Sequence, residues 1–206
     1  METYKPLVST AYLPTVDYMA TVVRCAGMVI EQHETFPKQT FRNRTVIATA
    51  NGPMMLNVPV TRPDGNHTTT ADIGISYHEP WNIRHWRAIV SAYNAAPYFL
   101  YYRDELESIL LQPHEHLIKL NDDLMRFILR RLKIDCTIEY SSQYIKSPQT
   151  EMDCRDSLTS KKSIPSNRPY SQVFESRLGF LPGMSVIDLL FNLGPEAKSY
   201  LIAQTN

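Results

Sequence analysis

The sequence predicts a mixed α/β fold, in which an N-terminal β-α-β unit and a β-hairpin precede helices packed on a mixed sheet and a helical C-terminal part. Three observations predict it. Two short apolar runs, residues 7–13 and 28–31, flank a stretch with helical spacing. Asn51-Gly52 lies between two further strand-like runs and is a strong signal for a hairpin turn. After residue 80, apolar residues recur mainly at helical spacing.

The length and charge of the chain bound its architecture and its partners. At 206 residues it fits a single domain, residues 1–206, in which residues 141–169 form a polar loop or lid insertion. The 21 basic and 21 acidic residues cancel, so no overall field attracts nucleic acid or an anionic membrane. Neither is expected as a partner. An anionic small molecule must instead be bound by a local cluster of side chains.

Cysteine use and the absence of targeting signals indicate the compartment. Cys25, Cys136 and Cys154 are odd in number and have no CxxC spacing, which argues against a zinc site or a disulfide scaffold and favours a reducing compartment. Cys25 lies near the C-terminal end of its expected helix, the wrong end to activate a thiol, so a buried thiol is expected. There is no signal-peptide pattern and no run of about 18 apolar residues. We expect a soluble, cytoplasmic protein.

The β-α-β unit is expected over residues 7–31. Pro14-Thr15 separates the first strand from a helix, and Gly27 is expected to end that helix before a second, parallel strand. In open parallel sheets, ligands bind outside the carboxyl ends of the strands, where a helix N-terminus presents unpaired N–H groups. Four side chains are expected on this rim: Tyr12, Thr15, His33 and Glu34.

A basic stretch, residues 36–44, follows the unit and leads into the hairpin. It places three cations and two amides close together. Guanidinium and amide groups present fixed donor forks, which suit a phosphate, a carboxylate or a polar sugar. The alternative is a solvated turn at the entrance to the hairpin. The candidate binding residues are Lys38, Arg42, Asn43 and Arg44.

The hairpin strands are expected at residues 45–49 and 54–60, and one more short strand at 71–77 follows a polar loop. Pro80 then begins an amphipathic helix. Its expected apolar face consists of Ile83, Trp86, Val90 and Tyr93. His85 lies on a flank of this helix, one turn from Trp81. It is either a ligand contact or a packed histidine that makes one hydrogen bond, and the packed interpretation is favoured.

Helices dominate the remaining chain. A short helix at 104–111 precedes a long helical stripe over 114–132, whose basic residues lie late, as the helix dipole favours. A strand at 134–140 follows, with Cys136 as a small buried hydrophobe. The polar segment 141–169 comes next. Ser185-x-x-Asp188 is typical of a capping box at the start of a helix at 186–193, and a last helix covers 196–203.

Common catalytic motifs are absent from the sequence, which has no GxxxxGKS/T, GxGxxG or GxSxG pattern. What remains is His33, which is adjacent to Glu34, two residues from Glu31 and close in sequence to the basic stretch. A histidine beside anion-binding groups fits general-base catalysis, although such sets also arise by chance on a polar rim. The sequence indicates neither a cofactor nor a group donor.

Six short patterns occur in a fixed order along the chain. They are Tyr12-Leu13-Pro14, Lys38-x-x-Phe41-x-Asn43-Arg44, Val58-Pro59-Val60, Trp81-x-x-x-His85-Trp86, Tyr93-Asn94-x-x-Pro97-Tyr98-Phe99 and Ser185-x-x-Asp188-Leu-Leu-Phe-Asn-Leu-Gly. Together they resemble the WbqC-like family over about residues 1–140 and 170–203, leaving residues 141–169 uncovered. The resemblance implies a bacterial enzyme of O-antigen and surface polysaccharide biosynthesis. One member has been suggested to transfer glycine to an amino sugar.

The chain departs from the family pattern in two places. Many members open with a His-Gln-Pro-Asn-Tyr run, whereas residues 8–12 here contain no histidine. After the second strand, members carry an acidic pair where this chain has Gln32-His33. If those positions take part in catalysis, activity here is altered or absent, and His33 is the candidate substitute for the lost histidine.

Two functions fit these observations. The first is a glycyl or acyl transferase that acts on an amino sugar or a nucleotide-linked sugar. Its catalytic candidates are His33 and His85, with Lys38, Arg42 and Arg44 on the phosphates and Asn43 and Tyr12 orienting the substrate. The second is a non-catalytic module that binds a nucleotide sugar or a protein, with Trp81 and Trp86 among its contacts. No metal site and no oligomeric state is indicated.

Overall fold

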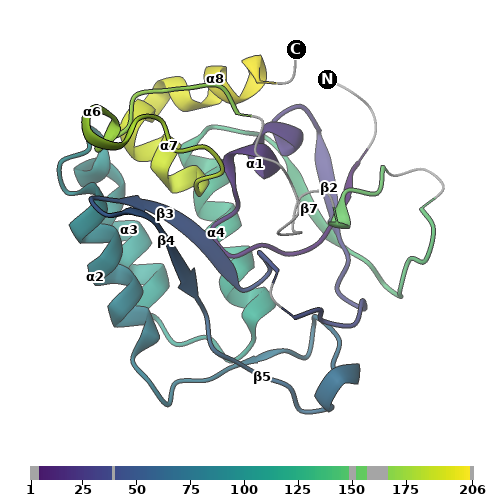
Figure 1. The fold of residues 1–206 in the computed structure, drawn as a ribbon. Helices are drawn as coiled ribbons and strands as arrows, with labels where there is room; N and C mark the ends of the chain where they lie inside the picture. Colours follow the sequence, from purple (N-terminus) through teal and green to yellow (C-terminus); the bar gives the residue numbers. More distant parts are fainter. Residues whose placement is uncertain (1–4, 39, 149–151, 157–166, 205–206) are drawn as a thin grey trace.

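The computed structural model describes residues 5–38, 40–148, 152–156 and 167–204, and Figure 1 shows the fold. The elements, in chain order, are β1 (Leu7–Val8), α1 (Val16–Val22), β2 (Gly27–Ile30), β3 (Arg44–Thr49), β4 (Gly52–Asn57), β5 (Val60–Thr61), η1 (Gly65–His67), β6 (Gly74–Ile75), α2 (Trp81–Tyr93), α3 (Phe99–Leu111), α4 (Leu117–Arg131), β7 (Thr137–Tyr140), α6 (Glu175–Leu178), α7 (Val186–Leu193), η2 (Gly194–Glu196) and α8 (Ala197–Ala203).

The predicted mixed α/β fold is confirmed, and the strands of the described residues form three small sheets. One is a parallel sheet in the order β1-β2-β7, the second is the antiparallel hairpin β3-β4, and the third pairs β5 with β6. In Figure 1 the hairpin lies between α2 and α3 on one side and the parallel sheet on the other, with α7 and α8 above it. β1, α1 and β2 form the predicted β-α-β unit.

Two boundaries in that unit differ from the prediction. The first strand ends at Val8 and not at Leu13, where the backbone adopts a φ of 45°. Thr15 caps α1 through its side chain, which accepts a hydrogen bond from the backbone N–H of Tyr18. α1 ends at Val22, so Gly27 begins β2 instead of ending the helix. A side chain at Gly27 would lie 2.3 Å from Oγ1 of Thr137 on β7, which explains the glycine at this position.

The helices bury the stripes that the sequence indicated, with one exception. The predicted core residues of α4 are all buried: Leu117, Leu120, Leu124, Phe127 and Ile128. On α2, however, Ile83 is 42% exposed, whereas Trp81, His85 and Ile89 are buried. Trp86 and Tyr93 of the predicted face are buried and Val90 is half-buried. The buried face of α2 is therefore shifted toward the flank that carries His85, which contacts Tyr12.

The predicted start of α7 is confirmed at Ser185, whose Oγ accepts a hydrogen bond from the backbone N–H of Ile187. Asp188 does not close a capping box. Its carboxylate accepts hydrogen bonds from Tyr170 and Gln172 instead, at 2.6 and 2.9 Å. This buried acid joins α7 to the segment that precedes α6, and burial raises the pKa of its carboxyl group.

Part of the polar segment 141–169 packs beside the parallel sheet. Leu7 of β1 forms a parallel bridge with Asp153, and the backbone N–H of Cys154 donates to the carbonyl of Leu7 at 2.8 Å. Cys154 and Arg155 are buried. Residues 152–154 thus continue the sheet beyond β1, whereas residues 149–151 and 157–166 of the expected loop or lid lie outside the described residues.

Within the described ranges, none of the helices is both long and apolar enough to cross a membrane.

Candidate functional site

A polar cavity of about 560 Å³ lies at the carboxyl ends of the parallel strands. This is the position at which open parallel sheets bind ligands. Side chains from the loop after β2, from the basic stretch, from the loop after β7 and from the segment beside β1 line the cavity: His33, Glu34, Thr35, Pro37, Arg42, Tyr144, Asp153, Arg155 and Asp156. His33 and Glu34 of the predicted rim line it, whereas Tyr12 and Thr15 do not, and four of its nine lining residues come from residues 144–156.

Glu31 organises the loops beneath this cavity. Its carboxylate is fully buried at the end of β2, where Oε1 accepts from the backbone N–H of His33 at 2.8 Å and from Oγ of Ser141 at 2.7 Å. The other oxygen accepts from the backbone N–H of Ile145 at 2.8 Å and lies 3.9 Å from Arg155. One carboxylate therefore joins the loop after β2, the loop after β7 and the segment beside β1.

Arg42 lines the cavity, but its guanidinium is already paired. Its Nε and Nη2 donate to the two carboxylate oxygens of Glu34 at 2.8 and 2.9 Å, and Nη2 also donates to Oγ of Ser9 at 2.6 Å. Arg42 is 2% exposed. A buried, bidentate pair of this kind fixes both side chains. Arg42 thus holds the basic stretch onto the strand ends, and its bidentate face is not open to a phosphate.

Arg155, another lining residue, is held in the same manner. Nε and Nη2 donate to the carboxylate of Asp153 at 3.0 and 2.7 Å, and Nη1 donates to the carbonyl of Ile145 at 2.8 Å. The guanidinium lies 5.7 Å from the centre of the Tyr144 ring. The hydrogen bonds to Arg155 lower the pKa of the Asp153 carboxyl group, which keeps that carboxylate ionised.

The balance of charge in the cavity is acidic. Its lining contains two arginines and three carboxylates, those of Glu34, Asp153 and Asp156. Both arginines are already ion-paired, Arg42 with Glu34 and Arg155 with Asp153. Asp156 is exposed. Because opposite charge is preferred in a partly desolvated site, the cavity favours an ammonium group or a neutral polyhydroxyl ligand over an anion.

The other members of the basic stretch do not line the cavity. Lys38 is exposed and follows Pro37, a lining residue. Asn43 donates to the carbonyl of Val58 at 2.9 Å, and Nε of Arg44 donates to Oδ1 of Asn57 at 2.9 Å. Asn43 and Arg44 therefore join the two strands of the hairpin at its open end, while Lys38 is an exposed neighbour of a lining residue.

A second group of predicted residues lies in the protein interior. Tyr12 is fully buried, and its hydroxyl lies 2.9 Å from Nδ1 of His85. Trp81 contacts both rings, with centroids 6.4 Å from Tyr12 and 5.1 Å from His85. Burial lowers the pKa of His85 to about 4 and raises the pKa of Tyr12. His85 is thus the packed, neutral histidine that the sequence favoured.

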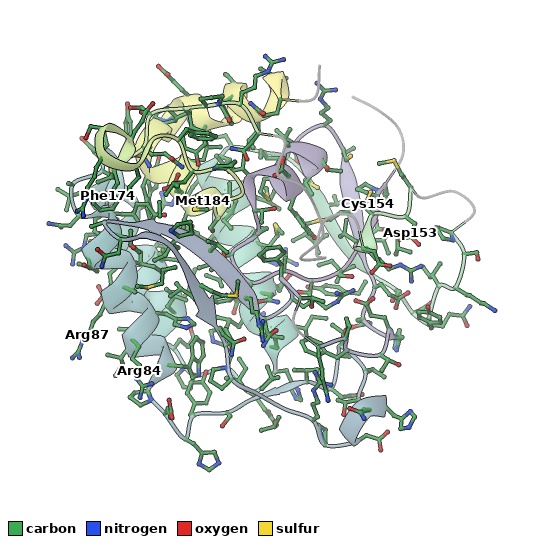
Figure 2. The ribbon with its side chains drawn as sticks, in the orientation of Figure 1. Arg84, Arg87, Asp153, Cys154, Phe174 and Met184 are labelled. Carbon is green, nitrogen blue, oxygen red and sulfur yellow. The ribbon has the colours of Figure 1, made fainter. Side chains whose placement is uncertain are left out.

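The two histidines belong to different regions. Figure 2 labels Arg84 and Arg87, the neighbours of His85 on α2, at the lower left of the molecule, and Asp153 on the cavity wall at the right. Trp86 contributes to neither region, since it stacks on Phe99 with ring centroids 6.1 Å apart. Of the nine predicted site residues, the structure brings His33 and Arg42 to the cavity.

Sequence reasoning missed Tyr144, Asp153, Arg155 and Asp156. They lie in a polar segment without periodicity, and their approach to His33 depends on pairing with β1 across more than a hundred residues, for which the local sequence holds no signal. Glu31 was visible as an acid directly after a buried strand, but its role required the positions of Ser141 and Ile145. No set of three or more histidine, cysteine or acidic residues suited to a metal ion occurs within the described ranges.

Comparison with known proteins gives two matches. A model of the WbqC-like protein family matches residues 10–162. Rv1507c, an uncharacterized protein of Mycobacterium tuberculosis, is 27% identical over 225 residues, which cover 95% of this chain and 96% of that protein. No solved structure matches. The family match runs through residues 141–162, which the sequence resemblance had left uncovered, and ends before the C-terminal helices, which it had included.

Proposed function

Since this chain belongs to the WbqC-like protein family, we propose that it is a transferase that carries a glycyl or other acyl group to the amine of an amino sugar in surface polysaccharide biosynthesis. The observation that carries the proposal is the acidic surplus of the cavity at the strand ends, in which both arginines are already paired. Such a cavity suits an amine-bearing acceptor.

The carboxylates of Asp153 and Asp156 would attract the ammonium form of the acceptor, and the hydroxyl groups of Thr35 and Tyr144 suit the hydroxyls of a sugar. A nucleotide-linked sugar would place its phosphates outside the cavity. Exposed Lys38 beside Pro37 offers a cation there, in place of the buried guanidinium of Arg42.

His33 is the proposed general base, because it is a histidine that lines the cavity. The bound ammonium group first loses one proton to water, and the neutral nitrogen then attacks the acyl carbon of the donor to form the new C–N bond. His33 takes a second proton from that nitrogen and passes it to the leaving oxygen or sulfur, as the tetrahedral intermediate collapses and the bond between the acyl carbon and the leaving group breaks. A donor with an ester or thioester leaving group supplies the acyl group.

The test combines a binding screen with a transfer assay. Nucleotide-linked amino sugars and their N-acetylated counterparts are screened by thermal shift, where a ligand at 100 times its dissociation constant adds about 2.7 kcal/mol of stability. Aminoacyl and acyl-thioester donors are then added, and the mass gain of the acceptor is measured. We expect the amine forms, and not the N-acetylated forms, to bind and to gain one acyl group.

Substitution His33→Gln should abolish the mass gain and leave the thermal shift in place. His67→Gln, an exposed histidine of η1, is the matched control and should retain full transfer. Transfer by the His33→Gln variant at the original rate would remove His33 from the chemistry. Binding of the amine forms without transfer from any donor would favour a non-catalytic binding module.

A further inference from the structure

A second cavity, of about 480 Å³, lies at the other end of β7, between the last turns of α4 and the link to the strand. Its apolar floor consists of Leu129 on α4, Ile134 on the link and Ile138 on β7. Because β7 runs from this cavity toward the polar cavity, the two hollows lie at opposite ends of the strand. We call this second one the β7 groove.

One edge of β7 has no partner strand among the described residues. β7 is the last strand of the sheet β1-β2-β7. The backbone N–H groups of Thr137 and Ser141 donate to Ala26 and Ile30 on the β2 side. Since backbone groups alternate in direction along a strand, those of Ile138 and Tyr140 point away from β2. This edge offers donors and acceptors to one further strand.

The rim of the β7 groove is basic. Arg126, Arg130 and Lys133 line it, against a single acid, Asp135. Arg126 pairs with Asp122 at 2.9 Å and Arg130 with Glu105 at 2.6 Å. A guanidinium has five N–H donors, and these two ion pairs engage only part of them. The rim can therefore hold carboxylates of a ligand in addition to those of the chain.

Lys133 occupies a backbone conformation that suits glycine. It lies directly after the C-cap of α4 with a φ of 53°. The N–H groups of Lys133 and Ile134 donate to the carbonyls of Arg130 and Leu129, the pattern in which helices usually carry glycine. A lysine here strains the backbone but adds a cation at the rim. Strained residues of this kind gather at functional sites.

We propose that the β7 groove is a docking site for an extended acidic segment of a partner protein, which adds to the sheet as a strand beside β7. The main-chain groups of Ile138 and Tyr140 would pair with the segment, an apolar side chain would enter the floor, and flanking carboxylates would meet the basic rim. Strand addition of this kind derives affinity from backbone pairing and specificity from side-chain pockets. The inference is independent of the proposed transferase.

The test uses capped heptapeptides and the whole chain labelled with ¹⁵N. The first peptide alternates glutamate and valine, the second alternates lysine and valine, and the third is the first with N-methyl groups along one edge. We expect only the first to shift the amide signals of Ile138 and Tyr140, and to bind less tightly as salt is raised. Equal binding of the lysine peptide or of the N-methylated peptide overturns the proposal, as does no binding at all.

The variant Lys133→Gly removes the rim cation and relieves the strained φ, so the fold is kept. We expect it to weaken binding of the glutamate peptide about threefold, in the range of one exposed ion pair. Lys146→Gly removes an exposed lysine in the loop after β7 that does not line the groove, and it should leave the affinity unchanged. Unaltered affinity in the Lys133→Gly variant overturns the role of the rim. Amide shifts at Ile138 that appear on raising the protein concentration alone would assign the groove to a second copy of the chain.

Discussion

The polar cavity and the aromatic cluster around His85 contain the same kinds of side chain but use them differently. In the cavity, His33 is half-buried, and the carboxylates of Asp153 and Asp156 remain accessible to solvent. In the cluster, His85 is 6% exposed, and its Nδ1 is bonded to Tyr12. The loops after parallel strands hold charged groups apart and leave room between them, whereas the face of α2 brings polar atoms together and excludes water.

This difference separates residues that support the fold from residues that meet a ligand. A buried polar atom that is already bonded stabilises the protein only while its partner is present. An exposed carboxylate in a cavity contributes little to stability and can bind a ligand. Arg42 combines both features: it lines the cavity, but its buried ion pair contributes to the stability of the fold.

Arg42→Ala should therefore have the largest effect on stability. The change leaves the buried carboxylate of Glu34 without its bidentate partner, and the loss of one member of a buried pair costs about 3–5 kcal/mol. Chemical denaturation monitored by circular dichroism measures it. Arg44→Ala is the matched control, since its half-buried side chain donates to Oδ1 of Asn57 and has no carboxylate pair among the described residues, and it should cost less than about 1 kcal/mol. Equal losses in the two variants would contradict the structural role of Arg42.

The sequence allowed the frame of the cavity to be predicted but not its wall. The parallel strands, the hairpin at Asn51-Gly52 and the helices around Leu124 and Val186 follow from local periodicity and turn chemistry, which act over a few residues. The direction of Arg42 depends on Glu34 and Ser9, and the position of Asp153 depends on its bridge with Leu7. Many other partners for these residues are compatible with the sequence. The pairs that form are determined by the tertiary structure.

The exposed Ile83 shows the same limit on a helix. Periodicity correctly located α2, but two overlapping stripes were available on its surface, one through Ile83 and one through His85. Trp86 and Tyr93 of the first stripe are buried, but in place of Ile83 the buried face includes Trp81 and His85, whose rings contact Tyr12. The fit of His85 against Tyr12 outweighs the greater hydrophobicity of Ile83. His85 is therefore buried and Ile83 is exposed.

The second largest effect should appear in the pH dependence of stability. The pKa of His85 lies at about 4 in the folded chain, below its ordinary value of 6.5, so the unfolded chain takes up the proton first as pH falls. The contribution of neutral His85 is complete above pH 6.5 and is lost toward pH 4, a change of about 3 kcal/mol.

Denaturation at a series of pH values measures this loss. His85→Asn should flatten the stability profile between about pH 6.5 and 4, the window set by these two pKa values. His67→Asn, on the surface, should leave the profile as it is. If the stability of His85→Asn still fell with pH as steeply as that of the unaltered protein, His85 would not be the group that titrates. The contrast between a buried His85 and an accessible His33 would then fail.

A smaller loss is expected from Tyr12→Phe. The change removes only the hydroxyl that bonds to Nδ1 of His85, so a buried hydrogen bond is lost while the ring contacts with Trp81 remain. The free energy of unfolding should fall by about 1 kcal/mol. Tyr77→Phe is the comparison at the surface: its ring also contacts Trp81 but is 39% exposed, and its hydroxyl accepts from the backbone N–H of His114 at 2.9 Å. Loss of ligand binding in Tyr12→Phe at unchanged stability would instead connect the cluster to the site.

Asp156→Asn should change stability least and binding most. Asp156 is exposed on the cavity wall, so its neutralisation should alter the free energy of unfolding by no more than about 0.5 kcal/mol. The same change removes one of three negative charges in the cavity and should weaken an amine-bearing sugar while leaving its N-acetylated form unaffected. Calorimetric titration of both forms measures the difference. If Asp156→Asn weakened both forms equally, the charge of the cavity would not select its ligand. Accessible and interior polar groups would then differ only in their effect on stability.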